Sequence, residues 1–176
     1  LVKMKISKLE LDGIVLIEPK VHIDTRGNFS ESFRKDLLSK YFDKEFIQDN
    51  IVESHKGVLR GLHYQLNYPQ DKLVQVLYGE IFDVAVDIRK DSPTFGKWIG
   101  QLLNCINKKQ LLIPSGYAHG YCVLSENAKV MYKCTEYYNE SDQYGFIWND
   151  STLNIDWPIK TPEISKNDSK LPNFKL

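Results

Sequence analysis

The sequence predicts an all-β fold, a sandwich or a barrel, and three observations support this. Short runs rich in β-branched and aromatic residues recur along most of the chain, as they do in strands. Turn-forming residues such as Asp91-Ser92-Pro93 separate these runs. Only one segment, 35–42, carries apolar residues at helical spacing. Many short strands at intervals of roughly 8–12 residues favour a sandwich or barrel over a parallel α/β sheet.

The expected elements follow one another along the chain. A weakly alternating strand at 13–18 comes first, and the helix at 35–42 has Leu37, Leu38 and Tyr41 at helical spacing. Strand-like runs come next, at 46–52, 73–77, 81–88, 98–103, 110–113, 120–124 and 129–135. Prolines recur from Pro158 to Pro172, so this end is expected to be irregular and to wrap the barrel.

Length and composition indicate a single domain with neither a nucleic-acid nor a membrane partner. For 176 residues one domain is the natural expectation. We expect an N-terminal arm and short helix at 1–45, a barrel core at 46–135, and C-terminal strands with a wrapping segment at 136–176. The 23 Lys and Arg balance the 23 Asp and Glu, so no basic field points to nucleic acid. The sequence has no run of about 18 apolar residues that would predict a membrane span.

The cysteines and the N-terminal residues predict a cytoplasmic location. The three cysteines are odd in number and well separated, at Cys105, Cys122 and Cys134. Dispersed, unpaired thiols suit a reducing compartment. The basic residues near the N-terminus are not followed by the apolar stretch of a signal peptide.

Residues 57–79 carry the outline of the first cupin motif, which normally places two histidines and a glutamate around a metal. Gly57 and Gly79 frame the segment, and His63 is its first histidine. Gln65 stands where the second histidine would be, and Lys72 where the glutamate would be. A divalent ion needs several neutral or anionic ligands, and a lysine repels it. The pattern therefore predicts a cupin scaffold without a metal site, with acid–base chemistry in its pocket.

The second half of the motif follows at Pro114, Gly116 and His119, so two histidines are expected to act in the pocket. Histidine titrates near neutral pH and is a natural proton acceptor. A histidine base needs an orienting carboxylate, and several are available: Asp24, Glu31, Asp49, Asp83, Asp87 and Asp168. Asp83 and Asp87 share one face of an expected strand, where we expect them to be solvated or hydrogen-bonded.

Four further residues offer complementary chemistry. A lysine in a dry pocket stabilises the enolate oxygen that forms when a proton next to a carbonyl is removed, and Lys72 is suited to this. Tyr132 lies in the expected strand 129–135 and is an acid that survives burial. Arg26 and Arg60 each precede a glycine, and the planar guanidinium of arginine suits a phosphate.

Several runs in the same order make the chain resemble the dTDP-4-dehydrorhamnose 3,5-epimerase family of deoxysugar biosynthesis, from Ile17 to Pro172. The matching runs are Asp24-x-Arg26-Gly27-x-Phe29-x-Glu31, Gln48-Asp49-Asn50, Val58-Leu59-Arg60-Gly61-Leu62-His63, Phe82-Asp83-Val84-Ala85-Val86-Asp87-Ile88-Arg89, Ser92-Pro93-Thr94-Phe95-Gly96, Ile113-Pro114-x-Gly116-x-Ala118-His119-Gly120 and Trp148-Asn149-Asp150. The resemblance implies a metal-free jelly-roll cupin with short peripheral helices and no cofactor. It also implies that the protein is an isomerase, which acts as a homodimer and inverts C3 and C5 of dTDP-4-dehydro-6-deoxy-D-glucose.

The resemblance implies catalytic roles at the matching positions. His63 would be the base, and Asp168 its orienting carboxylate. Tyr132 would be the acid on the opposite face of the sugar, and Lys72 would neutralise the enolate oxygen. His119 would line the sugar site.

The remaining residues implied by the resemblance bind substrate. Arg60 would bind the diphosphate. The nucleotide end would be held by Gln48, Asp49, Asn50, Tyr138 and Gln143; Gln143 stands where many relatives have glutamate. Arg26, Phe29 and Glu31 would lie on an N-terminal strand that is exchanged between subunits and completes the partner's site.

Other functions on the same scaffold remain open at this point. Some relatives invert only C3 with the same base and tyrosine. A sugar 3,4-ketoisomerase would use the same proton abstraction but move the carbonyl. A cupin that binds a nucleotide sugar without turning it over is a non-enzymatic alternative, but the chain has His63, Tyr132 and Asp168. A metal-dependent oxygenase fits least, because the second histidine and the glutamate of the metal motif are missing.

Overall fold

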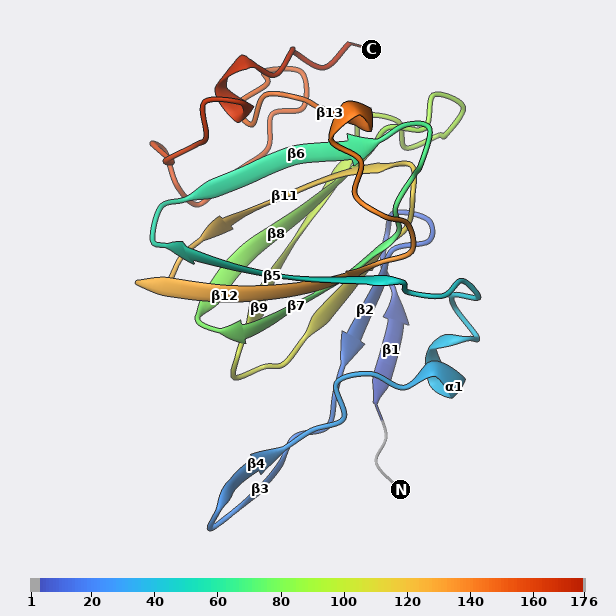
Figure 1. Cartoon of the computed structure of the whole chain (residues 1–176), viewed down its shortest axis with the longest axis vertical. Helices are drawn as coiled ribbons and strands as arrows, with labels where there is room; N and C mark the ends of the chain where they lie inside the picture. The colour runs from blue at the N-terminus through green and yellow to red at the C-terminus, as the bar shows by residue number, and fades with distance from the viewer. Residues whose placement is uncertain (1–3, 176) are drawn as a thin grey trace.

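The computed structural model describes residues 4–175 and contains two antiparallel sheets that face each other (Figure 1). The six-stranded sheet has the order β1 (Lys5–Lys8), β2 (Val15–Glu18), β10 (Gln110–Ile113), β7 (Lys72–Tyr78), β12 (Asn127–Cys134) and β5 (Gln48–His55). The five-stranded sheet has the order β13 (Gln143–Gly145), β6 (Leu59–Gln65), β11 (Tyr117–Val123), β8 (Glu80–Asp87) and β9 (Trp98–Asn104). Consecutive strands from β5 to β8 alternate between the sheets, as in a jelly roll. The predicted all-β sandwich is confirmed.

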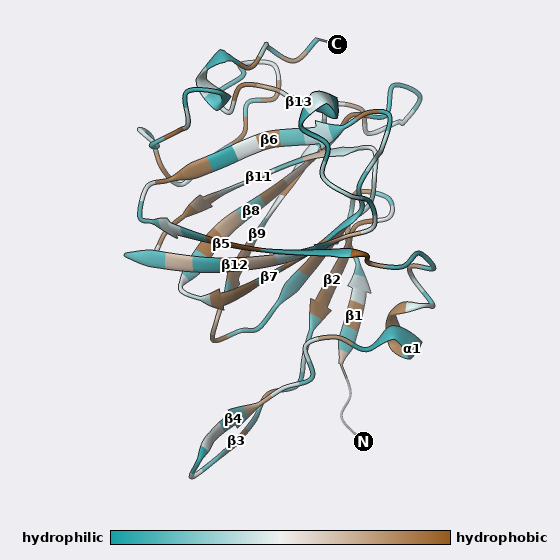
Figure 2. Cartoon of the chain, viewed as in Figure 1, coloured by the Kyte–Doolittle hydropathy of each residue, from teal (hydrophilic) through white to brown (hydrophobic). Residues whose placement is uncertain are grey.

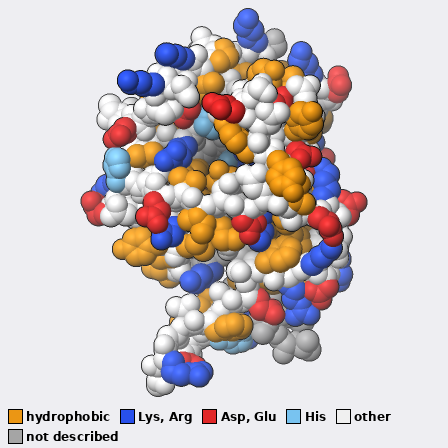
Figure 3. All heavy atoms as spheres, viewed as in Figure 1, with side chains coloured by type: hydrophobic (Ala, Val, Ile, Leu, Met, Phe, Trp, Pro, Cys, Tyr) orange, Lys and Arg blue, Asp and Glu red, His pale blue; other side chains and the backbone are white. Residues whose placement is uncertain are grey.

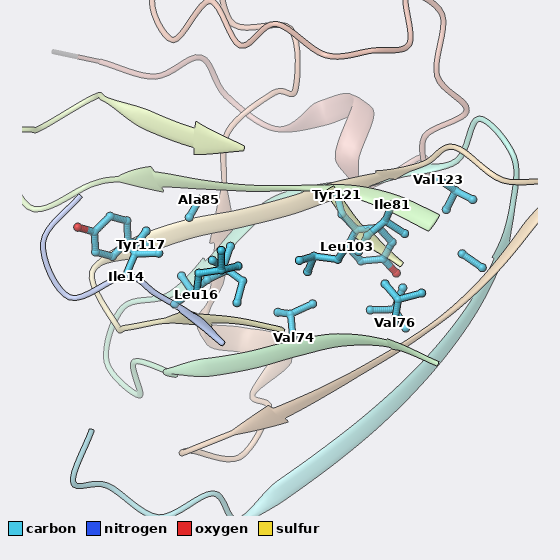
Figure 4. Close-up of a cluster of buried hydrophobic side chains, with 14 of the residues drawn as sticks. Ile14, Leu16, Val74, Val76, Ile81, Ala85, Leu103, Tyr117, Tyr121 and Val123 are labelled. Carbon is cyan, nitrogen blue, oxygen red and sulfur yellow. The ribbon is translucent and has the colours of Figure 1, made fainter. Parts of the chain in front are cut away.

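The main core lies between the two sheets. Val74 of β7 and Ile81 and Leu103 of β8 and β9 are fully buried there. Figure 4 shows these side chains, from both sheets, directed into one interior. Figure 2 shows the same pattern along the chain, with apolar residues concentrated on the strands of the sandwich. Apolar burial of this kind supplies the main driving force for the fold.

The C-terminal segment has little regular structure and covers the outer face of the five-stranded sheet. Its Leu153, Trp157 and Phe174 are buried against Val84 and Val86 of β8. The backbones also meet, since the Leu59 N–H at the start of β6 donates to the Glu163 carbonyl at 2.9 Å. A 3-10 turn at Asp168–Lys170 follows. This packing brings the turn beside β6.

The N-terminal region carries a hairpin of β3 (His22–Asp24) and β4 (Gly27–Phe29), which projects away from the sandwich (Figure 1). Every residue of both strands is exposed. Two of them are apolar: Ile23 is 81% exposed and Phe29 is 64% exposed. A strand pair with no neighbouring sheet and exposed apolar residues is unusual for a free surface.

The structure differs from the sequence prediction in several elements. β6 was not expected as a strand, because Gly61 and polar residues interrupt its pattern; pairing with β11 and β13 on its two sides supplies its hydrogen bonds. The short strands β1 and β3 were not expected either, whereas β4 lies within the N-terminal strand that the resemblance implied and β13 lies within the expected C-terminal strands. The helix α1 covers only Lys35–Leu38 rather than 35–42, since Leu38 is its one buried residue while Tyr41 is 40% exposed.

The surface carries both acidic and basic side chains. Acidic and basic side chains are interspersed over the face in Figure 3, in keeping with the zero formal net charge. Within residues 4–175, no helix has the length and apolar character needed to cross a membrane. Cys105, Cys122 and Cys134 are free thiols.

Candidate active site

Two adjoining cavities open between the walls of the sandwich. The larger, of about 500 Å³, is lined by residues of β5, β6, β7, β11, β12 and the C-terminal segment. The smaller, of about 290 Å³, extends toward the loops after β6 and β12. Four residues line both, and they mark the junction of the cavities: His63, Lys72, Tyr132 and Gln143. Three of the four are predicted catalytic residues.

The His63 side chain is held by Asp168. A hydrogen bond of 2.8 Å joins His63 Nε2 to Asp168 Oδ1, and the Asp168 side chain is largely buried. The Gly61 N–H donates to the other carboxylate oxygen at 3.3 Å, and the Asp168 N–H donates to the Ser165 hydroxyl at 3.0 Å. Because a carboxylate only accepts hydrogen bonds, Nε2 carries the proton and Nδ1 is left as the basic nitrogen. The structure thus selects Asp168 from the six candidate carboxylates.

The carboxyl group of Asp168 is ionised despite its burial. Burial alone raises its pKa, but the hydrogen bond and charge of His63, with the bonds from Gly61 and Ser165, bring the pKa below its ordinary value. Asp168 is therefore anionic at neutral pH and stabilises a positive charge on His63.

A second histidine–carboxylate pair lies beside the first. His119 of β11 is the register partner of His63, and its Nε2 lies 2.7 Å from Asp83 Oδ1. Asp83 is fully buried, and its Oδ2 has no hydrogen-bond partner among the residues that the structure describes. The same is true of the buried hydroxyl of Tyr121, which lines the larger cavity. Sequence reasoning did not single out Tyr121.

The other candidate carboxylates have partners elsewhere. Asp87 was expected to be solvated or hydrogen-bonded. It is fully buried and bonded to Arg89 at 2.7 Å, so it is hydrogen-bonded and not solvated. Asp24 pairs with Arg26, Asp49 with Lys133, and Glu31 lies 3.7 Å from Arg34. None of these lines either cavity.

Two glycines allow the histidine-bearing strands to approach. Gly61 has φ +123°, and a Cβ there would lie 2.5 Å from the Gly120 Cα. A Cβ on Gly120 would lie 2.8 Å from the Arg60 carbonyl oxygen. Only glycine tolerates both the backbone conformation and this spacing. Gly61 and Gly120 therefore permit the close approach of β6 and β11 beside the two histidines.

Lys72 and Tyr132 come from the opposite, six-stranded sheet. Burial lowers the pKa of Lys72, while Cys134 and Asp83 nearby oppose that shift. No salt bridge within residues 4–175 involves its ammonium group. Burial raises the pKa of Tyr132, so its hydroxyl stays protonated. A lysine and a phenol on one wall thus face the histidines on the other.

The predicted nucleotide-binding residues divide between the two cavities. Gln48, Asn50 and Tyr138 line the smaller one, while Arg60 lines the larger one and donates to the Ser54 hydroxyl at 3.1 Å. Asp49 lies between Gln48 and Asn50 on β5, so strand alternation turns it to the opposite face, away from both cavities.

The predicted residues of the N-terminal arm lie outside the cleft of their own chain. Arg26 and Phe29 are on the projecting hairpin, and Glu31 follows it. Arg26 is paired with Asp24 at 2.6 Å, and neither cavity is lined by any of the three.

The metal position of the motif carries other chemistry. Gln65 is buried, and its amide is bonded to the backbone of two loops. In residues 4–175, no three His, Cys, Asp or Glu side chains converge as a metal-binding cluster. Lys72 occupies the other altered position and lines both cavities.

The fold and the cleft together define a jelly-roll cupin whose pocket carries acid–base groups: two histidine–carboxylate pairs facing a lysine and a tyrosine. The family model for dTDP-4-dehydrorhamnose 3,5-epimerase matches residues 8–175. The chain belongs to this family, as the sequence runs predicted.

Individual relatives agree with this assignment. The chain is 50% identical over 168 residues to dTDP-4-dehydrorhamnose 3,5-epimerase of Shigella flexneri, covering 94% of this chain and 93% of that protein. Among solved structures, the epimerase of Legionella pneumophila in complex with dTDP-4-keto-L-rhamnose has a TM-score of 0.92 and 44% identity, covering 99% of this chain and 100% of that one. A 3'-monoepimerase of Streptomyces bikiniensis in complex with dTDP-quinovose has a TM-score of 0.88 and 30% identity, over 94% of this chain and 85% of that one.

The lowered pKa of Asp168 predicts a pH-dependent contribution to stability. Its pKa in the folded state is lowered, so its contribution is fully present above the unfolded value of about 4 and is lost as the pH falls through the folded value. Asp168→Asn should therefore be less stable than the wild type at about pH 6, and the gap should close toward about pH 2. Urea unfolding followed by tryptophan fluorescence measures this gap; a gap of constant size would contradict the lowered pKa.

Proposed function

We propose that this protein is an epimerase that inverts C3 and C5 of dTDP-4-dehydro-6-deoxy-D-glucose and so forms dTDP-4-dehydro-L-rhamnose. The observation that carries the proposal is the junction of the two cavities. There the His63–Asp168 pair lies on one wall and Tyr132 on the other. A base and an acid on opposite sides of one sugar ring are what an inversion requires, since a lone base tends to return the proton to the same face.

The chemistry begins with removal of a proton next to the ketone. The 4-keto group acidifies the C–H bonds at C3 and C5. His63 Nδ1 takes the proton, and the electron pair of the broken C–H bond moves to the carbonyl oxygen, forming an enolate. Asp168, 2.8 Å from Nε2, stabilises the imidazolium that results.

Lys72 and Tyr132 complete the reaction. The ammonium group of Lys72 is disfavoured by burial, and it gains a partner when the enolate oxygen becomes negative. The hydroxyl of Tyr132 then gives its proton to the opposite face of the carbon, and the carbonyl re-forms. The resulting tyrosinate and imidazolium exchange protons with solvent before the next turnover. The steps use side chains alone and require neither a metal nor a cofactor.

The remaining lining residues suit the rest of a sugar nucleotide. In this proposal the sugar lies at the junction and in the larger cavity, beside His119. Arg60 binds the diphosphate. Gln48, Asn50 and Tyr138 hold the nucleotide end in the smaller cavity, and Gln143, which lines both cavities, lies between the two parts.

Inversion of C3 alone is the principal alternative, because the Streptomyces bikiniensis neighbour is a 3'-monoepimerase. A ketoisomerase would move the carbonyl instead. A binding protein without turnover would not need the His63–Asp168 bond. The cytoplasmic location remains a prediction.

Turnover in D₂O distinguishes these functions. Because solvent replaces each proton that is removed and returned, the product of dTDP-4-dehydro-6-deoxyglucose should carry deuterium at both C3 and C5. NMR of the sugar measures this directly. Deuterium at C3 alone would identify a 3-epimerase. A product with its carbonyl at C3 would identify a ketoisomerase, and unchanged substrate would identify a binding protein.

Variants of the base and the acid should separate proton removal from proton delivery. His63→Ala should abolish both deuterium exchange and turnover, with a loss beyond the roughly 10²–10⁴-fold usual for one acid–base group, because no second base starts the reaction. Tyr132→Phe should lose inversion while keeping more of the exchange. Exchange in His63→Ala at the wild-type rate would contradict the assignment of the base.

We further propose that the active form is a homodimer in which each N-terminal hairpin completes the cleft of its partner. The hairpin projects from its own chain, exposes Ile23 and Phe29, and carries Arg26 outside its own cavities. Jelly rolls leave sheet edges open, and β5 is an edge strand of the six-stranded sheet and lines both cavities. An exchanged hairpin would cover apolar surface and such an edge together.

Subunit mixing tests the shared site. His63→Ala and Arg26→Ala should each be inactive, and refolding the two together should restore part of the activity, since one cleft of the mixed dimer regains both residues. Sedimentation gives the mass of the active species. An active monomer, or mixtures that recover nothing, would contradict the exchange.

A further inference from the structure

The side chain of Gln65 connects three separate segments of the chain. It lies at the end of β6 and is only 7% exposed. Its Nε2 donates to the carbonyl of Tyr68 at 2.7 Å and to that of Tyr137 at 3.2 Å. Its Oε1 accepts from the backbone N–H of Asn139 at 2.8 Å. Both amide hydrogens and the carbonyl oxygen are therefore used on backbone groups.

These bonds converge on the segment that carries Tyr138. The Tyr137 carbonyl and the Asn139 N–H are both held by Gln65, and the Tyr138 N–H between them donates to Gln48 Oε1 at 2.9 Å. All three consecutive residues are thus fixed to neighbouring strands through their backbone. Tyr138 lines the smaller cavity and is 53% exposed, so its position is set by the backbone bonds rather than by tight packing.

Other bonds also join the same two loops. The carboxylate of Asp142 accepts from the backbone N–H groups of Asn67 and Tyr68 and from the Asn67 side chain, at 2.7–3.1 Å. The Gln70 amide donates to the Glu136 carbonyl at 2.9 Å. The loop after β6 and the loop after β12 therefore hold together without Gln65. Two of the three bonds of Gln65 act on the residues on either side of Tyr138.

We propose that Gln65 is a positioning residue for nucleotide binding, which holds Tyr138 in the orientation that contacts the nucleotide end of the substrate. The inference rests on the proposed function, in which the smaller cavity takes that end. A wall that is already ordered binds more tightly, because less conformational freedom is lost on binding. The position that holds a metal in a metal-binding cupin would here serve recognition instead.

The chemistry of the amide explains why glutamine suits this position. The site needs two donated hydrogen bonds and one accepted bond from a single group. Glutamate keeps the acceptor but turns a carboxylate oxygen toward two carbonyls, and methionine keeps the size but loses all three bonds. Each substitution should free the Tyr137–Asn139 segment while leaving His63 in place, because the bond to Asp168 holds that histidine.

Binding of dTDP, measured by calorimetry, tests the proposal directly. Gln65→Met should weaken dTDP binding by about 10- to 100-fold, since lost buried hydrogen bonds typically have effects of this order. The KM for the sugar nucleotide should rise similarly, while kcat stays within about threefold. Gln75→Met is the matched control, because Gln75 lines neither cavity, and it should bind dTDP as the wild type does. If circular dichroism shows Gln65→Met to be unfolded, Gln65→Glu replaces it with the same expectation.

A double variant separates positioning from a general structural role. If Gln65 acts through Tyr138, then Tyr138→Ala should weaken dTDP binding much less in Gln65→Met than in the wild type. Unchanged dTDP binding in Gln65→Met, a fall in kcat with unchanged KM, or fully additive losses would each overturn the proposal. A wild type that inverts the sugar while the Gln65 variants bind normally would overturn this inference alone. A wild type that binds no dTDP would overturn the proposed function with it.

Discussion

The hydrogen bond between His63 and Asp168 is the interaction on which the cleft depends. It joins a strand of the five-stranded sheet to a turn 105 residues later in the chain. Asp168 reaches His63 because Trp157 and Phe174 anchor the C-terminal segment on the outer face of that sheet. The packing of the irregular C-terminal segment therefore determines both the orientation of His63 and the ionisation of Asp168.

The altered metal motif shows how a pocket changes its chemistry while its scaffold persists. Lys72 occupies one ligand position and extends a cation into the cleft, where burial makes an anionic partner valuable. Gln65 occupies another and turns its amide to the backbone of two loops. One former ligand position thus serves charge stabilisation, and the other serves the shape of the adjoining cavity. Both uses follow from the same fact, that side chains at these positions point between the sheets.

The projecting hairpin sets a different constraint. Its exposed Ile23 and Phe29 have no sheet of their own to pack against. Glu53 and Ser54 of the edge strand β5 line the larger cavity of the same chain. The proposed exchange between subunits would cover both the apolar side chains of the hairpin and the edge strand beside the cavity.

The features that the sequence determined by itself depend on residues close together along the chain. Alternation and turn chemistry predicted most strands of the sandwich, and the spacing of the two half-motifs predicted that His63, His119 and Lys72 would meet in one pocket. Residue chemistry alone left the partner of His63 undecided among six carboxylates, because that choice depends on contacts between distant segments. Only the family resemblance implied Asp168. The sheet alternation that turns Asp49 away, the pairing that makes β6 a strand, and the three backbone bonds of Gln65 were likewise decided only in the tertiary structure. Periodicity records which face of an element is buried, whereas which residues meet across that face depends on how the elements pack.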